Sequence, residues 1–230
     1  MSNILSLIIP FVLLALFMGT AVTLAVKSNK RLKSITTSYA TEHGWRYDTP
    51  SPDIPFFQQL KGYSNKDKTF IEGKIGGYHF WLYGFLSGIG GGPGNRLMSH
   101  YLSINLSFNL PTTLLGPRSV SAVTNPLARI NDSLVQLNNN LVPLKLEGDA
   151  DNRFSVMVEK GQEAISLQYL TPDLLNVLEQ QVKSTVVLSG NFVSINAGVV
   201  AAVKNEQALN ELFAGAEALL KTLPPQPPST

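Results

Sequence analysis

An uncharged apolar run near the N-terminus restricts what this chain can fold into more than any other feature. The run extends from Ile4 to Val26 without a charged side chain, and most of its residues are Leu, Ile, Val, Phe or Ala. A helix of that length crosses the hydrocarbon core of a bilayer with some tilt. The run is longer than the apolar part of a signal peptide, and no basic residue precedes it. We therefore expect an uncleaved transmembrane helix over residues 4–26, after a short extracytoplasmic segment over residues 1–3.

Basic side chains follow this run and predict its orientation. No Lys or Arg precedes the run, whereas four follow it closely, at Lys27, Lys30, Arg31 and Lys33. Because Lys and Arg are retained on the cytoplasmic side, we expect the N-terminus outside and residues 27–230 in the cytoplasm. The sequence thus predicts a single-pass protein of the cell membrane. The same four residues either contact anionic lipid headgroups or act as a topology signal only.

The composition of the remaining chain excludes several classes of function. Outside the basic cluster, 14 basic residues stand against 16 acidic ones, and a nearly neutral domain argues against a nucleic-acid partner. The chain has no cysteine, which excludes disulfides, thiolate zinc sites and thiol redox chemistry. Charged residues make up only 15% of the chain, so we expect a large buried core rather than disorder. The expected partners are the lipid bilayer and other membrane proteins.

The chain after the apolar run divides into three parts. Apolar residues recur at helical spacing up to a plausible stop at Gly44, which predicts a basic juxtamembrane helix over residues 27–44. A soluble domain is expected over residues 45–223, with a possible internal boundary near residues 120–140. The proline-rich end, residues 224–230, predicts a disordered tail.

Strand patterns dominate the first half of the soluble domain. A Gly-Gly pair between two β-rich runs, Thr69–Ile75 and Tyr78–Leu86, predicts a hairpin with a primed turn. Both faces of the second run are aromatic, so we expect both to be covered. The segment Met98–Leu110 alternates between apolar and polar residues, which predicts a long antiparallel strand with one polar face. We expect Pro111 to end that strand.

Helices and shorter strands are expected in the second half. A threonine N-cap followed by proline predicts a helix from Thr171 to about Lys183, and amphipathic spacing predicts a last helix over residues 206–223. Other expected elements are a helix at Pro126–Leu137, strands at Trp45–Tyr47, Leu144–Leu146 and Phe154–Val158, and a hairpin of Thr185–Ser189 with Phe192–Asn196. Regular βαβ alternation is missing. The predicted class is therefore α+β, with a mainly antiparallel sheet and two to three packing helices.

A glycine-rich loop follows the predicted hairpin and is the one candidate ligand loop. Its glycines are Gly88, Gly90, Gly91, Gly92 and Gly94. No Lys-Ser/Thr pair follows, as a phosphate-binding loop requires, and a proline stands where a dinucleotide motif needs its third glycine. We interpret the segment as a strand connection. The alternative is a lid over a ligand.

Residues with catalytic or metal-binding chemistry show no recognised pattern. The histidines lack ligand-like spacing. The acidic run Glu147-x-Asp149-x-Asp151 lacks the glycine that a calcium loop needs at its sixth position. No Gly-x-Ser-x-Gly elbow is present. We therefore expect no catalytic, cofactor or metal site. The three histidines are His43, His79 and His100.

Three loose motifs give the chain a family resemblance. They are Ala40-x-x-x-Gly44-Trp45-x-Tyr47, the Thr-Pro-x-Leu-Leu start of the Thr171 helix, and Gly190-x-x-Val193. With the N-terminal apolar run, this layout resembles the DUF3137-like group of bacterial membrane-anchored proteins of unknown function. The resemblance implies a membrane-anchored layout and no catalytic residues.

Taken together, these patterns favour a non-enzymatic role beside a membrane. The first hypothesis is a membrane-tethered cytoplasmic interaction module, because a tether raises the local concentration of a domain near its membrane partners. The second is a small-molecule or anionic lipid-headgroup binder that uses the basic cluster and the glycine-rich loop. The third is an enzyme with an unrecognised site.

Overall fold

The computed structural model describes residues 34–50, 54, 68–87, 97–118, 140–198 and 205–223. The predicted transmembrane helix over residues 4–26 and the Lys27–Lys33 cluster lie outside these ranges, as do the Gly88–Gly94 loop, the predicted Pro126–Leu137 helix and the tail over residues 224–230. No helix within the described ranges is long and apolar enough to cross a membrane.

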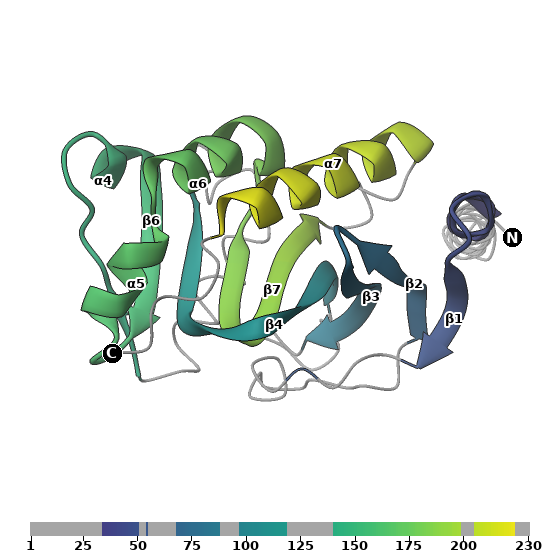
Figure 1. The fold of residues 1–230 in the computed structure, drawn as a ribbon, viewed down its shortest axis with the longest axis horizontal. Coiled ribbons are helices and arrows are strands. Elements are labelled where there is room, and N and C mark those ends of the chain that lie inside the picture. Colours follow the sequence, from purple (N-terminus) through teal and green to yellow (C-terminus); the bar gives the residue numbers. More distant parts are fainter. Residues whose placement is uncertain are drawn as a thin grey trace, which may run out of the picture.

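The fold is α+β with an antiparallel sheet and several helices, as the sequence predicts (Figure 1). The strands are β1 (Arg46–Pro50), β2 (Lys68–Ile75), β3 (Tyr78–Ser87), β4 (Leu97–Pro117), β5 (Leu141–Pro143), β6 (Phe154–Glu159) and β7 (Val186–Gly198). A helix over residues 34–42, which we call the stem helix, precedes β1. The later helices are α4 (Ala150–Arg153), α5 (Glu163–Tyr169), α6 (Pro172–Val177), the π-helix η1 (Leu178–Val182) and α7 (Glu206–Thr222).

Two long strands, β4 and β7, hold the sheet together. The strand order is β1-β2-β3-β4-β6-β5, and β7 pairs with β4 from His100 to Leu115. Strand β3 pairs with residues 97–105 of β4, and β6 pairs with residues 113–117. Each stretch of β4 has two edges, and β7 pairs with one of them in both stretches. The other edge of β4 is therefore shared by β3, along the first stretch, and β6, along the second. The sheet therefore has two ends, β1-β2-β3 and β6-β5, joined by the β4–β7 ribbon.

The hydrophobic core lies between one face of this sheet and the helices. Helices α6 and α7 run along that face in Figure 1. Buried apolar residues from every sheet strand except β1 and β5 meet buried residues of the stem helix, α6, η1 and α7 in one cluster. Each fully buried Leu, Ile, Val or Phe side chain contributes about 1.5–3 kcal/mol. Residues before and after the 120–140 segment contribute to this same core.

Local signals in the sequence are confirmed where one or two residues decide the backbone. Gly76 and Gly77 have φ angles of +55° and +86°, as a type I′ turn between β2 and β3 requires. The Thr171 side chain accepts a hydrogen bond from the Leu174 N–H at 3.2 Å, so the predicted N-cap forms. Helical structure then extends through α6 and η1 to Val182, with Lys183 in the left-handed region.

The stem helix ends as its glycine predicts. Gly44 has a φ of +66°, the Gly44 N–H donates to the Thr41 carbonyl at 3.1 Å, and the Trp45 N–H donates to the Ala40 carbonyl at 2.7 Å. These two bonds form a Schellman motif. The chain then turns directly into β1, with the Trp45 ring over Gly73 of β2.

One prediction about β4 is wrong, and one about β7 is confirmed. Pro111 does not end β4, which continues to Pro117. The predicted hairpin of Thr185–Ser189 with Phe192–Asn196 forms, although both of its arms carry the label β7: Gly190 has a φ of +55°, and the Asn196 N–H donates back to the Thr185 carbonyl at 2.9 Å. The pairing shifts register between Asn105 and Leu110 and again before Thr113, so Pro111 sits in an irregular stretch where no N–H is needed. Strand β4 therefore bends around the tip of this hairpin and pairs with both of its arms.

Three further differences follow from tertiary packing. Strand β5 covers Leu141–Pro143 rather than Leu144–Leu146, although the Leu144 N–H still donates to the Val156 carbonyl at 3.0 Å. Helix α5 is not predicted by the sequence. The polar face of β4 is exposed only in part: Ser107 and Asn109 are exposed, whereas Ser103 is fully enclosed, with its Oγ 2.6 Å from the Ser194 Oγ. The hydrogen bond between hydroxyls on neighbouring strands replaces the hydrogen bonds that these groups would otherwise form with water.

Candidate functional site

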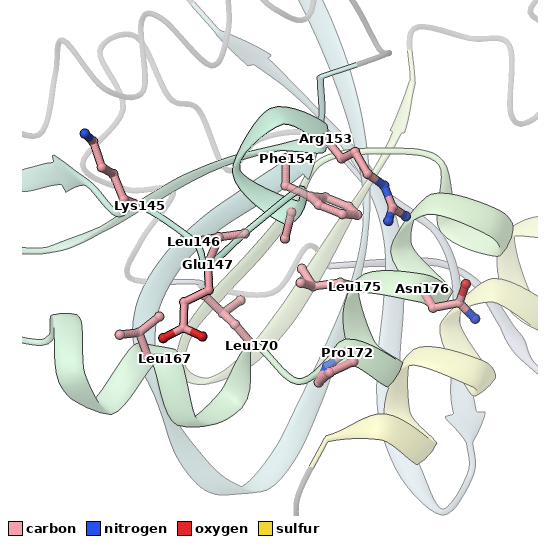
Figure 2. Close-up of a pocket in the computed structure, with 11 residues that line it drawn as sticks. Lys145, Leu146, Glu147, Arg153, Phe154, Leu167, Leu170, Pro172, Leu175 and Asn176 are labelled. Atoms are coloured by element: carbon pink, nitrogen blue, oxygen red, sulfur yellow. The ribbon is translucent and has the colours of Figure 1, made fainter.

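A groove lies at the β6-β5 end of the sheet, between α4, α5 and α6 (Figure 2). Its volume is about 610 Å³. The apolar side chains that line it are Leu146, Ala150, Phe154, Leu167, Leu170, Pro172 and Leu175. The polar ones are Lys145, Glu147, Arg153 and Asn176. We call this feature the α4–α6 groove.

Short-range hydrogen bonds shape its walls. Gly148 has a φ of +59°, and the Leu146 N–H donates to the Asp151 carboxylate at 3.1 Å, which folds the connection before α4 back on itself. On the opposite wall, the Thr171 cap begins α6 and directs Leu175 toward the groove. In the acidic run Glu147-x-Asp149-x-Asp151, the Asp151 carboxylate thus holds the backbone of the turn.

Apolar surface remains exposed along α5. Leu167 is 45% exposed and lines the groove, whereas Ile165 is 49% exposed on the same helix and does not line it. Ser166 and Tyr169 are the buried residues of α5, so the helix is anchored by a face other than the one that carries Leu167. A large apolar side chain at the edge of an apolar groove indicates a surface for a ligand or partner.

The charges around the groove differ in how they are satisfied. The Arg153 guanidinium donates to Glu179 through Nε, at 3.1 Å to Oε1, and through a second nitrogen to the other carboxylate oxygen. These hydrogen bonds from Arg153 lower the pKa of the Glu179 carboxyl. Glu147, in contrast, forms no ion pair or hydrogen bond with any residue that the structure describes. Lys145, which also lines the groove, likewise has no described partner, so the lining carries one negative and one positive charge without a described partner.

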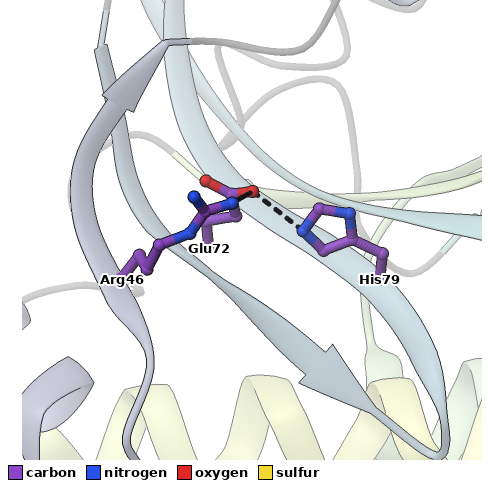
Figure 3. Close-up of polar contacts among 3 residues, drawn as sticks. All are labelled: Arg46, Glu72 and His79. Carbon is purple, nitrogen blue, oxygen red and sulfur yellow. Dashed lines mark hydrogen bonds and ion pairs between the residues drawn. The ribbon is translucent and has the colours of Figure 1, made fainter.

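A second polar site joins β1, β2 and β3 (Figure 3). Glu72 on β2 is only 5% exposed, and its carboxylate binds the Arg46 guanidinium of β1. The His79 Nε2 of β3 lies 2.9 Å from the same carboxylate. Burial raises the pKa of Glu72, but the neighbouring Thr49 hydroxyl and the charges of Arg46 and His79 lower it by more, so the pKa lies below its usual value. A carboxylate held in this way pins an edge strand and is a poor proton acceptor.

The three histidines do not meet. His43 ends the stem helix, where its Nδ1 lies 2.8 Å from the Tyr39 carbonyl. His79 pairs with Asn105 across β3–β4, whereas His100 pairs with Gly84, so the two are separated along the same ladder. Among the described residues no group of three or more His, Asp or Glu side chains is arranged to hold a metal.

Sequence reasoning missed the groove because its walls come from three separate segments. The residues around 146–154, 167–170 and 172–176 meet only after β6, α5 and α6 pack. The sequence does offer one signal, a cluster of leucines after Ser166. These leucines are more numerous than the buried face of a short helix can accommodate, so at least one of them must line a groove or the surface. The predicted basic cluster and glycine-rich loop remain predictions, since they lie outside the described ranges.

Comparisons with known proteins relate this chain to others through its fold. No protein-family model matches the chain, and no curated protein matches its sequence. A crystal structure of the mycobacterial trehalose monomycolate transport factor A shares the fold, with a TM-score of 0.52 and 13% sequence identity. The match covers 85% of this chain and 98% of that one. At this identity the likeness concerns the fold alone.

Proposed function

We propose that this chain is a membrane-tethered binding module. In this proposal residues 4–26 anchor it with the N-terminus outside, and the α+β domain lies in the cytoplasm. The α4–α6 groove then binds an apolar group of a partner or ligand. The DUF3137-like resemblance, which stays a proposal, agrees with such an anchored layout.

The observation that carries the binding role is the groove with its exposed leucine. A volume of about 610 Å³ lies inside the range of roughly 300–1,000 Å³ typical of ligand sites. Covering the exposed part of Leu167 would contribute roughly 1 kcal/mol, and the other apolar lining residues add to that. The described charges near the groove are either paired or isolated, an arrangement that favours binding over acid–base catalysis.

A second candidate function is the handling of an amphiphilic lipid. The apolar lining favours it, because a hydrocarbon chain needs no hydrogen-bond partners. The fold neighbour is named for transport of trehalose monomycolate. A lipid ligand would fill the same groove, so the two candidates differ in the chemical nature of the occupant.

Site-specific photo-crosslinking tests the groove. A benzophenone amino acid replaces Leu167 in the full chain expressed in its host, and the same amino acid at Ile165 is the matched control, since both side chains are similarly exposed on α5. We expect a light-dependent adduct from position 167 and none from position 165. Equal adducts, or none at either position, would remove the binding role. The mass of the adduct separates a lipid from a protein.

The tether is testable because the chain contains no cysteine. Single-cysteine variants Ser2→Cys and Ser229→Cys place one thiol at either end. With a membrane-impermeant maleimide, the first variant should label in intact cells and the second only after permeabilisation. Labelling of Ser229→Cys in intact cells would contradict the proposed orientation.

A further inference from the structure

The α4–α6 groove lies at the opposite end of the sheet from the stem helix. The stem helix leads into β1 at one edge, whereas the groove adjoins β5 and β6 at the other (Figure 1). Along β4, the pairing with β3 centres near Tyr101 and the pairing with β6 near Leu115. Between these two halves of β4 lie both arms of β7, since the Asn196 N–H donates to the Thr185 carbonyl. From β1 to β5 the sheet therefore counts eight strand spacings of about 4.8 Å, or roughly 38 Å along the sheet.

This placement separates the groove from the proposed tether. Residues 27–33 directly precede the stem helix, and seven residues reach at most about 25 Å even when extended. The chain's own basic cluster therefore cannot reach its own groove. The argument rests on the proposed function: if the tether lies at the stem end, the groove faces away from the bilayer that holds the chain.

The charge at the groove restricts the occupant further. Figure 2 shows the Glu147 side chain directed toward the part of the groove that Leu167 and Leu170 line, while Lys145 points away. Arg153 is neutralised by Glu179. The occupant that complements this surface combines apolar side chains with a positive charge. A phosphate or carboxylate headgroup would instead place like charges together, which is unfavourable.

We propose that the α4–α6 groove binds the apolar face of a cationic amphipathic helix from a partner protein, with Glu147 paired to a Lys or Arg of that helix. An amphipathic helix presents apolar residues three and four positions apart, and such a row fits a groove bounded by leucines on both walls. The Lys or Arg residues of such a helix lie at the border of its apolar face. When the apolar face is docked in the groove, this border comes next to Glu147. The partner then docks on the side of the domain remote from the tether.

A charge-reversal experiment tests the pairing. The full-length chain in phosphatidylcholine nanodiscs is titrated into a fluorescein-labelled Leu/Lys amphipathic helical peptide, and binding is read by anisotropy against empty nanodiscs. A Leu/Glu peptide with the same leucine positions is the second probe. We expect the Leu/Lys peptide to bind roughly tenfold more tightly. Glu147→Lys should reverse that preference. Glu211→Lys, on the exposed face of α7, changes net charge equally and should leave it unchanged.

An apolar substitution tests the location. Leu167→Glu should weaken binding of the Leu/Lys peptide by roughly tenfold or more, since it places a charge on the groove wall. Ile165→Glu is the matched control on the same helix and should change binding less than about twofold. Both side chains are exposed, so thermal unfolding should show both variants folded.

The outcomes separate this inference from the proposed function. Equal binding of the two peptides, or a preference that Glu147→Lys leaves unchanged, overturns the cationic-helix inference. If a dansylated fatty acid, but neither peptide, binds in a manner that depends on Leu167, the occupant is a hydrocarbon chain; the inference then falls and the binding module stands. Absence of peptide binding, fatty-acid binding and any crosslink from position 167 overturns both.

Discussion

The two ends of the sheet use apolar side chains in different ways. At the β1-β2-β3 end, five rings from the stem helix, the β1 start, β3 and α7 pack against one another. At the β6-β5 end, short helical segments leave an open groove and an exposed leucine. The first end holds elements together, and in our proposal the second end receives another molecule. The five rings, which we call the aromatic cluster, belong to Tyr39, His43, Trp45, Phe80 and Phe213.

The aromatic cluster fixes the stem helix on the domain. The Trp45 ring lies 4.8 Å from both Phe80 and Phe213, and Tyr39 stacks on Phe213 at 5.8 Å. The Tyr39 hydroxyl also donates to the Asn210 Oδ1 of α7 at 2.7 Å. Aromatic pairs of this kind contribute about 0.5–1.5 kcal/mol beyond burial. A tether attached through this helix would hold the whole domain in a defined orientation.

The largest expected effect is at the centre of this cluster. Phe213 is 6% exposed and touches the rings of Tyr39, Trp45 and Phe80. Phe213→Ala should lower the free energy of unfolding by about 3–5 kcal/mol, measured by urea denaturation, because it leaves a cavity among three elements. A loss below about 1 kcal/mol would contradict the claim that this end is tightly packed.

A glycine beneath the cluster gives the next largest effect. A Cβ on Gly73 would lie 2.5 Å from the Trp45 ring, which must then move. Gly73→Ala should destabilise the fold by about 1–3 kcal/mol. The same substitution in a Trp45→Ala background should have less effect, since the clashing ring is gone. Additive losses in this double-mutant cycle would show that the contact is unimportant.

The Glu72 site gives a smaller and pH-dependent effect. Because folding lowers the pKa of this carboxyl, its contribution is present above the unfolded value near 4.5 and is lost as the pH falls through the folded value. Glu72→Gln should lower the free energy of unfolding by about 1 kcal/mol near pH 7, because it removes the charge that pairs with Arg46. The effect is no larger because Arg46 is exposed, so solvent screens this ion pair. The difference from wild type should shrink in acid. A constant difference from about pH 3 to 7 would assign the loss to packing instead.

The smallest stability effect is expected at the groove. Leu167→Glu should change the free energy of unfolding by less than about 0.5 kcal/mol, because the side chain is already largely in solvent. The same variant should lose ligand binding. A stability loss comparable with that of Phe213→Ala would show that the two ends do not differ in the way described.

Local signals predicted the parts of the fold that depend on one or two residues. Gly44, the Gly76-Gly77 pair and Thr171 specify backbone angles or a capping group, and these requirements hold in any tertiary setting. Gly190 carries the same kind of signal, and the chain turns there as predicted, with the Asn196 N–H donating to the Thr185 carbonyl. Pro111 carries a strand-ending signal, yet it lies within β4. The effect of Pro111 is overridden because β4 pairs with β7 on both sides of it, and the ladder tolerates an irregular stretch there.

The candidate sites were less predictable than the fold. His79 is visible in the sequence, but nothing local relates it to Glu72 and Arg46, which reach it only through the pairing of three strands. The groove depends similarly on long-range packing. Its leucines look like ordinary core residues until the position of α5 leaves Leu167 outside.

The sequence alone determined the class of the fold, its helix caps and glycine turns, and the expectation of a tether, because composition, periodicity and backbone preference are properties of short segments. Only the tertiary structure decided which surfaces stay open. Whether a leucine is core or binding site depends on what packs against it. For Leu167 that is decided by segments far apart in the chain, so its role appears only once the sheet and helices are assembled.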